Sequence, residues 1–294
     1  MPHTPQDRSR LFILVAALTL VWGTNWVLFP LAVREVSIWT FRAICLLGSG
    51  SLVLIFARLR GMSLHVPRAE RRTLVLAGLT YLVVWNLAST YAAVLLPSGQ
   101  AAILGFTMPI WAVLLTWLFL RERPSARLMA GIVLAAAGVG LLAFAARNAF
   151  ASAPLGFAAG LVAGLGWAGG TLILKRAGLT TPPIVSTGWQ LIVAGVPIAA
   201  IALFKGAGHP FDVSWTSVLV MGYITIMPMA LGNVLWFSIV NMLPASVSGL
   251  SAVMVPMVAM VTGALVRAEP LGVLELSAMA CCGASMALVL IKRN

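Results

Sequence analysis

Long apolar runs separated by short polar breaks follow one another along the entire chain. A helix needs about 20 mostly apolar residues to cross a membrane, and ten of the runs reach that length. The breaks contain proline, glycine or charged residues and leave no room for an extramembrane domain. The pattern therefore predicts ten membrane-spanning helices, at residues 11–33, 37–58, 73–95, 98–120, 125–146, 154–174, 183–204, 215–241, 245–266 and 270–291.

One stretch of the chain occurs twice. The segment Asn86–Glu122 aligns without gaps with Asn233–Glu269 at a shift of 147 residues, which is half of the 294-residue length. The matched positions are Asn86 and Asn233, Leu96-Pro97 and Leu243-Pro244, Pro109 and Pro256, and Glu122 and Glu269. A repeat of this size indicates a duplicated architecture. We therefore expect two five-helix repeats, residues 1–147 and 148–294.

Five helices in each repeat is an odd number, so the second repeat must enter the membrane from the opposite side. Inverted repeats have a pseudo-two-fold axis in the membrane plane, and the sites of such transporters lie between the halves near the midplane. The expected fold class is an all-α integral membrane protein, with ten transmembrane helices arranged as two inverted five-helix repeats around a central cavity.

The composition agrees with a protein embedded in a lipid bilayer. Hydrophobic residues make up 61% of the chain and charged residues 9%, whereas a soluble domain carries roughly 25% charged residues. The net charge of +12 would suit a nucleic-acid-binding protein, but the Lys and Arg residues flank the apolar runs, where they determine topology. We therefore expect no nucleic-acid partner.

Basic residues are divided unequally between the two sets of loops. When chain ends and loops are assigned alternately to two sides, one side carries 14 of the 19 Lys and Arg residues and the other carries four, with Arg42 inside a span. The side rich in basic residues holds both termini. Because such loops remain in the cytoplasm, both termini are predicted to be cytoplasmic.

Tryptophans and amides inside the spans are candidates for lining the cavity. Trp22, Asn25 and Trp26 are spaced three and four residues apart, so they share one helix face. An amide in lipid is costly without a partner, which directs Asn25 toward protein or a cavity. The other candidates are aromatic or polar residues of later spans: Tyr81, Trp85, Asn86, Ser89, Trp111, Trp167, Asn233 and Trp236. Such a set suits an aromatic or apolar zwitterionic ligand, although packing between helices explains the same residues.

Arg42 is the only basic residue clearly within a predicted span. An ionisable residue inside a membrane is a functional candidate, and a guanidinium can hold a substrate carboxylate bidentately. Its position near the predicted periplasmic end of its span also allows the side chain to reach the interface, and a role in the fold is a further reading.

Two prolines occupy equivalent positions of the repeats. Pro109 and Pro256 lie inside spans 4 and 9, where proline removes a backbone hydrogen bond. The pair predicts matching kinks, which are either hinges or static bends.

The sequence lacks the residues that metal binding, phosphate binding and catalysis require. No group of His, Cys, Asp and Glu has the spacing of metal ligands, and there is no glycine-rich phosphate loop with its lysine. No nucleophile can be paired with a base in the sequence. We therefore expect no metal, no cofactor, no catalytic residue and no ATPase subunit, which disfavours an integral membrane enzyme acting on lipid.

The order of the motifs resembles a known family. Trp-Gly in span 1, an Arg early in span 2 and the Leu-Pro, Pro and Arg-Glu positions of spans 3 to 5 resemble the drug/metabolite transporter superfamily, EamA type. The stretch LVWGTNWVLFPLAVREVSIWTFRA is most similar to the YddG-type aromatic amino-acid exporters. This resemblance implies alternating access, a small-molecule substrate and export across a bacterial-type inner membrane.

The expected function is export of aromatic or large apolar amino acids and related metabolites. Alternatives are an exporter of another metabolite or of a lipophilic drug, a membrane enzyme, and a channel; the inverted repeat favours alternating access over a channel. Every His and six of the seven acids lie in tails or loops, and Glu275 lies near the end of a span. Since a proton-driven carrier usually has a titratable group within the membrane, we expect a facilitator.

The charge distribution gives a testable topology. Cysteine labelling or reporter fusions should place residue 3, the loop 61–70 and residue 294 in the cytoplasm, and the loop 206–212 in the periplasm, because basic loops are retained inside. Termini on opposite sides of the membrane would mean an odd number of spans and would contradict the inverted repeat.

Overall fold

The computed structural model describes residues 5–121, 123–145, 147–205, 213–243, 252, 254–269 and 271–290. All regular elements in these ranges are helices. Eight are long and apolar enough to cross a membrane, and two further apolar helices, Val255–Arg267 and Val273–Ser285, are shorter. Some positions used in the sequence analysis lie outside the described residues, namely residues 1–4, Glu122, the loop 206–212, Pro244 with the first part of span 9, and residues 291–294.

The helices of each half follow the predicted spans. The first half contains α1 (Pro5–Gly23), η1 (Trp26–Leu28), α2 (Phe29–Ala32), α3 (Ile38–Leu59), α4 (Arg68–Ala77), η2 (Gly78–Val83), α5 (Val84–Leu95), α6 (Ser98–Gly105), α7 (Met108–Leu120) and α8 (Ala126–Ala145). The second half, after the short α9 (Arg147–Ser152), contains α10 (Pro154–Ala177), α11 (Pro183–Lys205), α12 (Trp215–Ile224), η3 (Thr225–Leu231), α13 (Gly232–Met242), α15 (Val255–Arg267) and α16 (Val273–Leu290).

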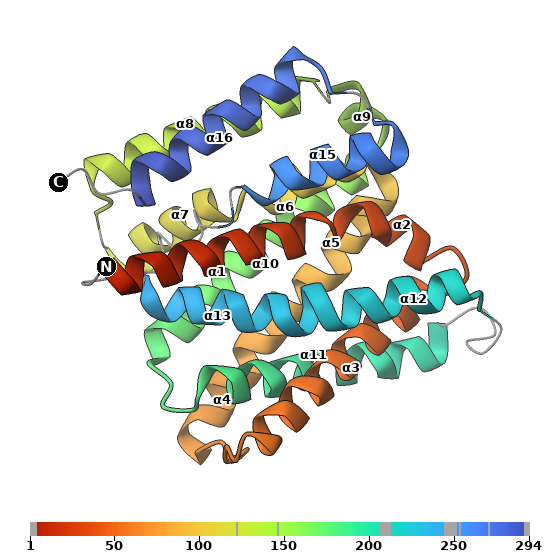
Figure 1. Ribbon diagram of the computed structural model, residues 1–294, viewed down its shortest axis with the longest axis vertical. Helices are drawn as coiled ribbons and strands as arrows, with labels where there is room; N and C mark the ends of the chain where they lie inside the picture. The colour runs from red at the N-terminus through yellow and green to blue at the C-terminus, as the bar shows by residue number, and fades with distance from the viewer. Residues whose placement is uncertain are drawn as a thin grey trace.

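The spans run back and forth between two edges of the bundle. Figure 1 shows the start of α1 and the end of α16 at the same edge, on the left, while α10 begins at the opposite edge. The second repeat is therefore inverted relative to the first. The helix pairs that pack together obey the same symmetry: α3 packs on α11, α8 on α16, α6 on α15, α5 on α10 and α1 on α13. When each helix is replaced by its counterpart in the other repeat, the first three pairs are unchanged, and the pair of α5 and α10 becomes the pair of α13 and α1.

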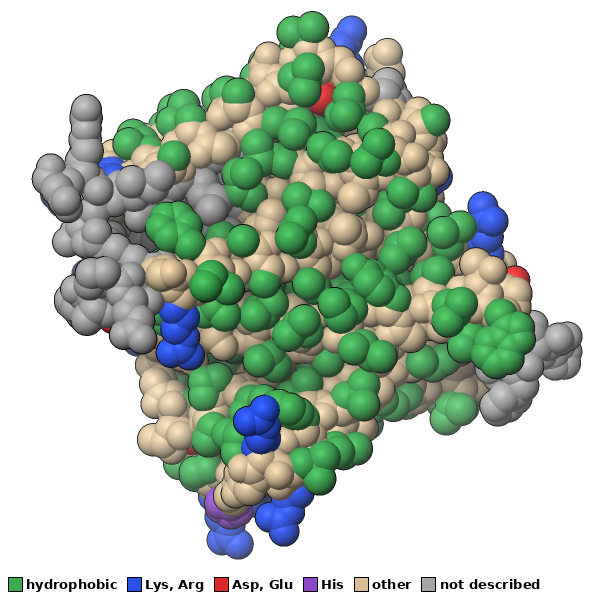
Figure 2. Space-filling model, viewed as in Figure 1, with side chains coloured by type: hydrophobic (Ala, Val, Ile, Leu, Met, Phe, Trp, Pro, Cys, Tyr) green, Lys and Arg blue, Asp and Glu red, His purple; other side chains and the backbone are tan. Residues whose placement is uncertain are grey.

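The outer surface is apolar, as contact with lipid requires. Figure 2 shows hydrophobic side chains over most of one face, with Lys and Arg mainly near its edges. Phe204, Leu203 and Leu118 are among the large apolar side chains that are largely exposed. In a soluble protein an apolar surface of this extent would drive aggregation. It therefore agrees with a multi-pass membrane protein.

Two spans are interrupted by π-helical segments at equivalent positions. In span 3, η2 is π-helical between α4 and α5, and in span 8, η3 is π-helical between α12 and α13. A shift of 147 residues places the start of η2 on the start of η3. Such segments shift the backbone hydrogen bonds and are frequent at functional sites. Nothing in the hydrophobic pattern predicts them.

The prolines of spans 4 and 9 begin helices instead of kinking them. In span 4, α6 ends at Gly105 and α7 starts at Met108, with Pro109 in the first turn. Pro256 takes the same place in α15. At a first turn the N–H that proline lacks has no helical partner in any case. The expected continuous kinked helix is thus corrected to a broken one in span 4, and the role of these prolines as hinges stays a prediction.

Glycines allow α10 to approach its neighbours closely. A Cβ atom added at Gly160 would lie 2.5 Å from the Cβ of Leu104, and one added at Gly170 would lie 2.3 Å from the Cβ of Tyr81. Small residues spaced along a helix allow this kind of contact between membrane helices. The α10 glycines therefore hold the second half against spans 3 and 4 of the first half.

Two adjacent glycines of α10 give a matched test of this packing. Gly170→Ala should lower the melting temperature in detergent, because overpacking costs about 1–3 kcal/mol. Gly169→Ala should leave the melting temperature unchanged or raise it, because its Cβ would meet only the methyl group of Thr80 at 3.7 Å, and alanine favours a helix by about 1 kcal/mol over glycine. Equal melting temperatures for the two variants would contradict close packing at Gly170.

Candidate functional site

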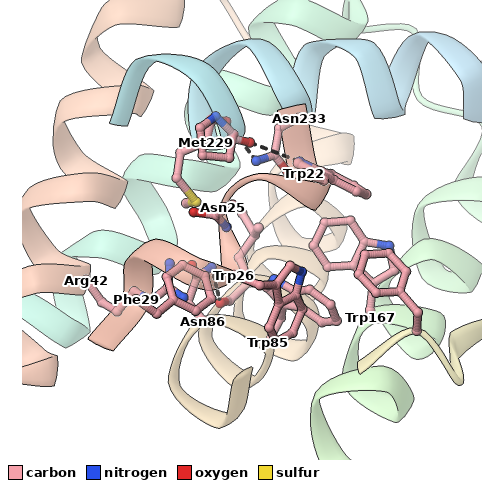
Figure 3. A pocket seen from close by; sticks show the side chains of 13 residues that line it. Trp22, Asn25, Trp26, Phe29, Arg42, Trp85, Asn86, Trp167, Met229 and Asn233 are labelled. Atoms are coloured by element: carbon pink, nitrogen blue, oxygen red, sulfur yellow. Dashed lines mark hydrogen bonds between the residues drawn. The ribbon is translucent and has the colours of Figure 1, made fainter. Parts of the chain in front are cut away.

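A small cavity lies between the two halves, where the interrupted spans meet. Its volume is about 20 Å³, which is room for about one water. Figure 3 shows its side chains converging from several helices. The lining residues are Trp22, Asn25, Trp26, Phe29, Arg42, Leu82, Trp85, Asn86, Phe106, Trp167, Pro228, Met229 and Asn233. The volume is too small for an amino acid, so these side chains must separate before the cavity can hold one.

The structure brings most of the candidate residues together. Eight of them line the cavity: Trp22, Asn25, Trp26, Arg42, Trp85, Asn86, Trp167 and Asn233. The other four do not belong to the lining. Tyr81 and Trp236 are buried behind Trp167 and contact its ring, Ser89 is buried beside Arg42, and Trp111 donates its indole N–H to Thr107.

Tryptophan rings form the walls of the cavity. The ring centroids of Trp22 and Trp167 lie 5.2 Å apart at 88°, and those of Trp85 and Trp167 lie 4.8 Å apart at 63°. Trp26 meets Trp85 edge-on at 6.1 Å. Edge-to-face pairs are favoured because the positive edge of one ring meets the negative face of another. The cluster joins α1 and η1 of the first half to α10 of the second.

Trp22 also makes a polar contact across the halves. Its indole Nε1 donates to the backbone oxygen of Pro228 at 3.0 Å, within η3. Gly232 leaves room for this contact, since a Cβ there would lie 2.3 Å from Nε1 of Trp22. A π-helical segment rearranges the carbonyl partners, and the indole N–H satisfies one of these carbonyls from the other repeat.

Three asparagine side chains present unpartnered oxygens at the cavity. Nδ2 of Asn86 donates to the backbone oxygen of Leu82, and Nδ2 of Asn233 donates to that of Met229, both at 2.7 Å. These contacts are equivalent in the two repeats and fix the orientation of each amide. The Oδ1 atoms of Asn25, Asn86 and Asn233 are buried without a hydrogen-bond partner in the part of the chain that the structure describes. An acceptor left unsatisfied costs free energy, so the three oxygens favour a ligand that donates N–H groups.

Arg42 brings a buried positive charge to the same cavity. Its side chain is 1% exposed; Nε donates to Oγ1 of Thr90 at 2.5 Å and Nη2 to Oγ of Ser89 at 3.5 Å. The guanidinium also lies over the ring of Phe29 at 4.4 Å. No described Asp or Glu forms an ion pair with it. The full burial rules out the expected alternative in which Arg42 extends to the membrane interface.

Sequence reasoning missed five lining residues, namely Phe29, Leu82, Phe106, Pro228 and Met229. Phe29 lies seven residues after Trp22 and four after Asn25, so helical spacing could have added it to that face. Leu82 and Met229 are repeat mates one turn before the asparagines, so the repeat could have found them as a pair. Phe106 lies at the break between α6 and α7, which the hydrophobic pattern does not reveal.

Carboxylate side chains form hydrogen bonds between the two halves at both edges of the bundle, and we call these contacts carboxylate clasps. Glu269, after α15, accepts from Oγ of Ser98 at 2.7 Å, and Glu35 accepts from the backbone N–H of Ser214 at 2.8 Å. Both contacts lie at the predicted periplasmic edge. The backbone N–H of Ser214, with the hydroxyls of Ser217 and Ser214, lowers the pKa of Glu35 below its usual value. The Glu35 clasp therefore contains an ionised carboxylate at neutral pH.

The clasp at the opposite edge is symmetry-related to the Glu35 clasp. There Glu70, at the start of α4, accepts from the backbone N–H groups and hydroxyls of Thr180 and Thr181. Glu35 follows span 1 and meets the start of span 8, whereas Glu70 starts span 3 and meets the loop after span 6. The inverted repeat relates these two locations to each other, and in both of them the acid belongs to the first half.

The contact between Trp22 and Pro228 can be tested through Gly232. Gly232→Ala should lower the melting temperature, because the added methyl group displaces the indole and breaks a hydrogen bond worth about 0.5–1.5 kcal/mol. Gly222→Ala is the control, since a Cβ at Gly222 meets nothing within 4 Å. In a double-mutant cycle the penalty of Gly232→Ala should shrink when Trp22 is replaced by Ala. An unchanged penalty would mean that the two residues are not coupled.

Comparison with known proteins agrees with this architecture. The EamA-like transporter family matches residues 9–144 and again residues 154–291. Transporter YvbV of Bacillus subtilis is 26% identical over 273 residues, covering 92% of this chain and 88% of the relative. Inner membrane transporter YedA of Escherichia coli is 26% identical over 269 residues, covering 90% and 85%. A protein of known crystal structure shares the fold with a TM-score of 0.75 at 17% identity, covering 95% and 96%. The chain is a multi-pass membrane transporter and belongs to the EamA-like transporter family.

Proposed function

We propose that the protein exports aromatic or large apolar amino acids and related zwitterions from the cytoplasm. One observation carries the proposal: the cavity combines a buried, unpaired guanidinium, three unpartnered amide oxygens and walls of tryptophan. These groups complement, in turn, a carboxylate, an ammonium group and an apolar side chain. The similarity of the N-terminal stretch to aromatic amino-acid exporters supports the same substrate class.

Arg42 would bind the substrate carboxylate. Burying a charge is costly unless it is paired or hydrogen-bonded, and the acceptors of Arg42 among the described residues are the hydroxyls of Ser89 and Thr90. Its remaining N–H groups are free to form the paired bonds that a carboxylate accepts. Phe29 stacks on the guanidinium and holds its plane. A carboxylate here would therefore neutralise the charge.

The asparagines would bind the substrate ammonium group. Asn86 and Asn233 come from equivalent places of the two repeats, and Asn25 comes from span 1. Each offers an oxygen that lacks a partner, and an ammonium group has three N–H donors. An aromatic substrate side chain would then displace the ring contacts among Trp22, Trp85 and Trp167 and replace them with its own. The affinity for an aromatic side chain should exceed that for a small one.

Transport by alternating access fits the contacts at the two edges. The cavity is too small for a substrate, and two of the carboxylate clasps, Glu269 with Ser98 and Glu35 with Ser214, lie at the predicted periplasmic edge. Release to the periplasm would require these contacts between the halves to break. Pro109 and Pro256 are the proposed hinges, because each lies in the first turn of a helix, where proline costs no helical hydrogen bond. The moving units would be residues 1–147 and 148–294.

Transport would be facilitative. Among the described residues no Asp, Glu or His lines the cavity, and the guanidinium of Arg42 keeps its proton at physiological pH. A proton-coupled carrier needs a group that changes protonation in the membrane. The substrate would therefore move down its own gradient, outward when its cytoplasmic concentration is high.

Flux in proteoliposomes tests the function. Phenylalanine and tryptophan should be carried faster than threonine, with methionine between them, and the flux should persist without a pH gradient or membrane potential. Arg42→Met should lower phenylalanine flux tenfold or more, because a bond to a charged group is worth about 1.5–3 kcal/mol. Arg42→Lys should retain part of the flux.

Two controls separate binding from folding. Arg60→Met removes an exposed arginine that also stacks on a phenylalanine, Phe56, at 5.0 Å, and it should leave the flux unchanged. Phenylalanine methyl ester has no carboxylate, so its flux should not respond to Arg42→Met. Flux of the ester or of lipophilic drugs without flux of any amino acid would favour the drug-exporter alternative, and concentrative uptake driven by a proton gradient would contradict facilitation.

A further inference from the structure

A second hollow lies at the edge of the bundle where α10 ends and α11 begins. Its volume is about 480 Å³, within the range of roughly 300–1,000 Å³ found for small-molecule pockets. The walls come from α10, the loop after it, the first turns of α11 and the end of α13. The positive-inside rule assigns this edge to the cytoplasm. We call this space the α10–α13 hollow.

Lys175 places a positive charge in the wall of the α10–α13 hollow. The side chain is partly buried, and its Nζ donates to the backbone oxygen of Val240 at 2.6 Å. An ammonium group has three N–H donors, and no described acid forms an ion pair with this one. The nearby clasp acid, Glu70, instead accepts from Thr180 and Thr181. The charge of Lys175 is therefore left to attract an anion from the hollow.

Lys175 differs from an ordinary topology-determining residue. The next residue, Arg176, is exposed and does not line the hollow. Both contribute to the basic character of this loop, but only Lys175 has its ammonium group anchored to a backbone carbonyl of the facing helix, α13. This anchoring orients the charge, which a positive-inside role does not require.

Gln190 offers an acceptor from the opposite wall. Its side chain is 1% exposed, and its Nε2 donates to Oγ of Ser186 at 2.8 Å. Among the described residues its Oε1 atom has no hydrogen-bond partner, and it is buried from solvent. A buried unsatisfied oxygen costs free energy unless a donor reaches it. The ammonium group of a ligand in the hollow would supply that donor once the side chain turns toward the hollow.

The α10–α13 hollow is connected to the central cavity through aromatic rings. Phe237 lines the hollow, and its ring centroid lies 5.9 Å from that of Tyr81. Tyr81 in turn contacts Trp167 at 5.1 Å, and Trp167 lines the central cavity. An apolar side chain held against Phe237 is thus one ring away from the residues that surround the central cavity.

We propose that the α10–α13 hollow is a cytoplasmic docking site for the zwitterionic substrate. Lys175 binds the carboxylate, Oε1 of Gln190 accepts from the ammonium group, and the apolar side chain packs on Phe237. The site is separate from the central cavity, and the assignment of its ligand rests on the proposed export function. Docking there concentrates substrate beside the rings of Tyr81 and Trp167 before the halves move apart.

Protection of a thiol from alkylation tests the docking site. Asn241 is exposed and lines the hollow, so Asn241→Cys places a reporter thiol there in the full-length chain. Labelling by a maleimide in detergent is followed by mass spectrometry of the peptide that carries the introduced thiol, which separates it from the native cysteines. Phenylalanine should slow the labelling, and phenylalanine methyl ester, which lacks the carboxylate, should do so at least tenfold less effectively.

Variants of two neighbouring basic residues complete the experiment. Lys175→Met should raise the half-protecting concentration of phenylalanine about tenfold or more, because a charge-assisted bond is lost. Lys175→Arg should restore protection, and Arg176→Met should leave it unchanged. Arg42→Lys, which alters the central cavity, should reduce flux while protection at the hollow persists.

The outcomes separate the docking site from the export function. Phenylalanine flux in proteoliposomes without protection of the thiol, or with protection that Lys175→Met and Arg176→Met reduce equally, would overturn the docking site and leave the export function standing. Absence of phenylalanine flux with Lys175-dependent protection would overturn the export function and keep a carboxylate-binding site at the hollow. Protection that vanishes in Arg42→Lys would show that the ligand occupies only the central cavity, which also overturns the docking site.

Discussion

The contact between the indole of Trp22 and the backbone of Pro228 ties the two halves together at the centre of the molecule. The indole N–H satisfies a carbonyl of the π-helical η3, while the ring packs edge-on against Trp167. Because Gly232 has no side chain, the indole of Trp22 can approach the backbone there. Trp22 and Pro228 both line the cavity, so this contact between the halves forms part of its wall.

The membrane imposes the constraint behind this arrangement. Backbone groups in the hydrocarbon region must be satisfied by protein, and each interruption of a helix alters the partners of some carbonyls. In spans 3 and 8 an asparagine one turn after the π-helical segment donates to a carbonyl of that segment. The amide nitrogens therefore serve the fold, and the amide oxygens are left facing the cavity. One residue type thus supports the backbone and brings unpartnered acceptors to the cavity.

Positive and negative side chains have different surroundings in the molecule. Arg42 lies buried at the central cavity and Lys175 lies at the hollow on the predicted cytoplasmic edge, and among the described residues neither pairs with an acid. The described acids Glu35, Glu70 and Glu269 instead accept hydrogen bonds at the ends of helices and join the halves. The buried or partly buried positive charges are thus left without an acidic partner among the described residues, while the acids are used in contacts between the halves.

The sequence by itself determined the membrane class, the ten spans, the duplication and the face shared by Trp22, Asn25 and Trp26, because apolar run length and repeat spacing are local properties. It also placed Asn86 and Asn233 as mates. Only the tertiary structure decided which aromatic rings meet at the cavity: Trp167 lines it, Trp236 packs behind Trp167, and Trp111 donates to Thr107 instead. The π-helical segments, the helix break before Pro109 and the full burial of Arg42 likewise depend on packing between helices, which no spacing along one helix encodes.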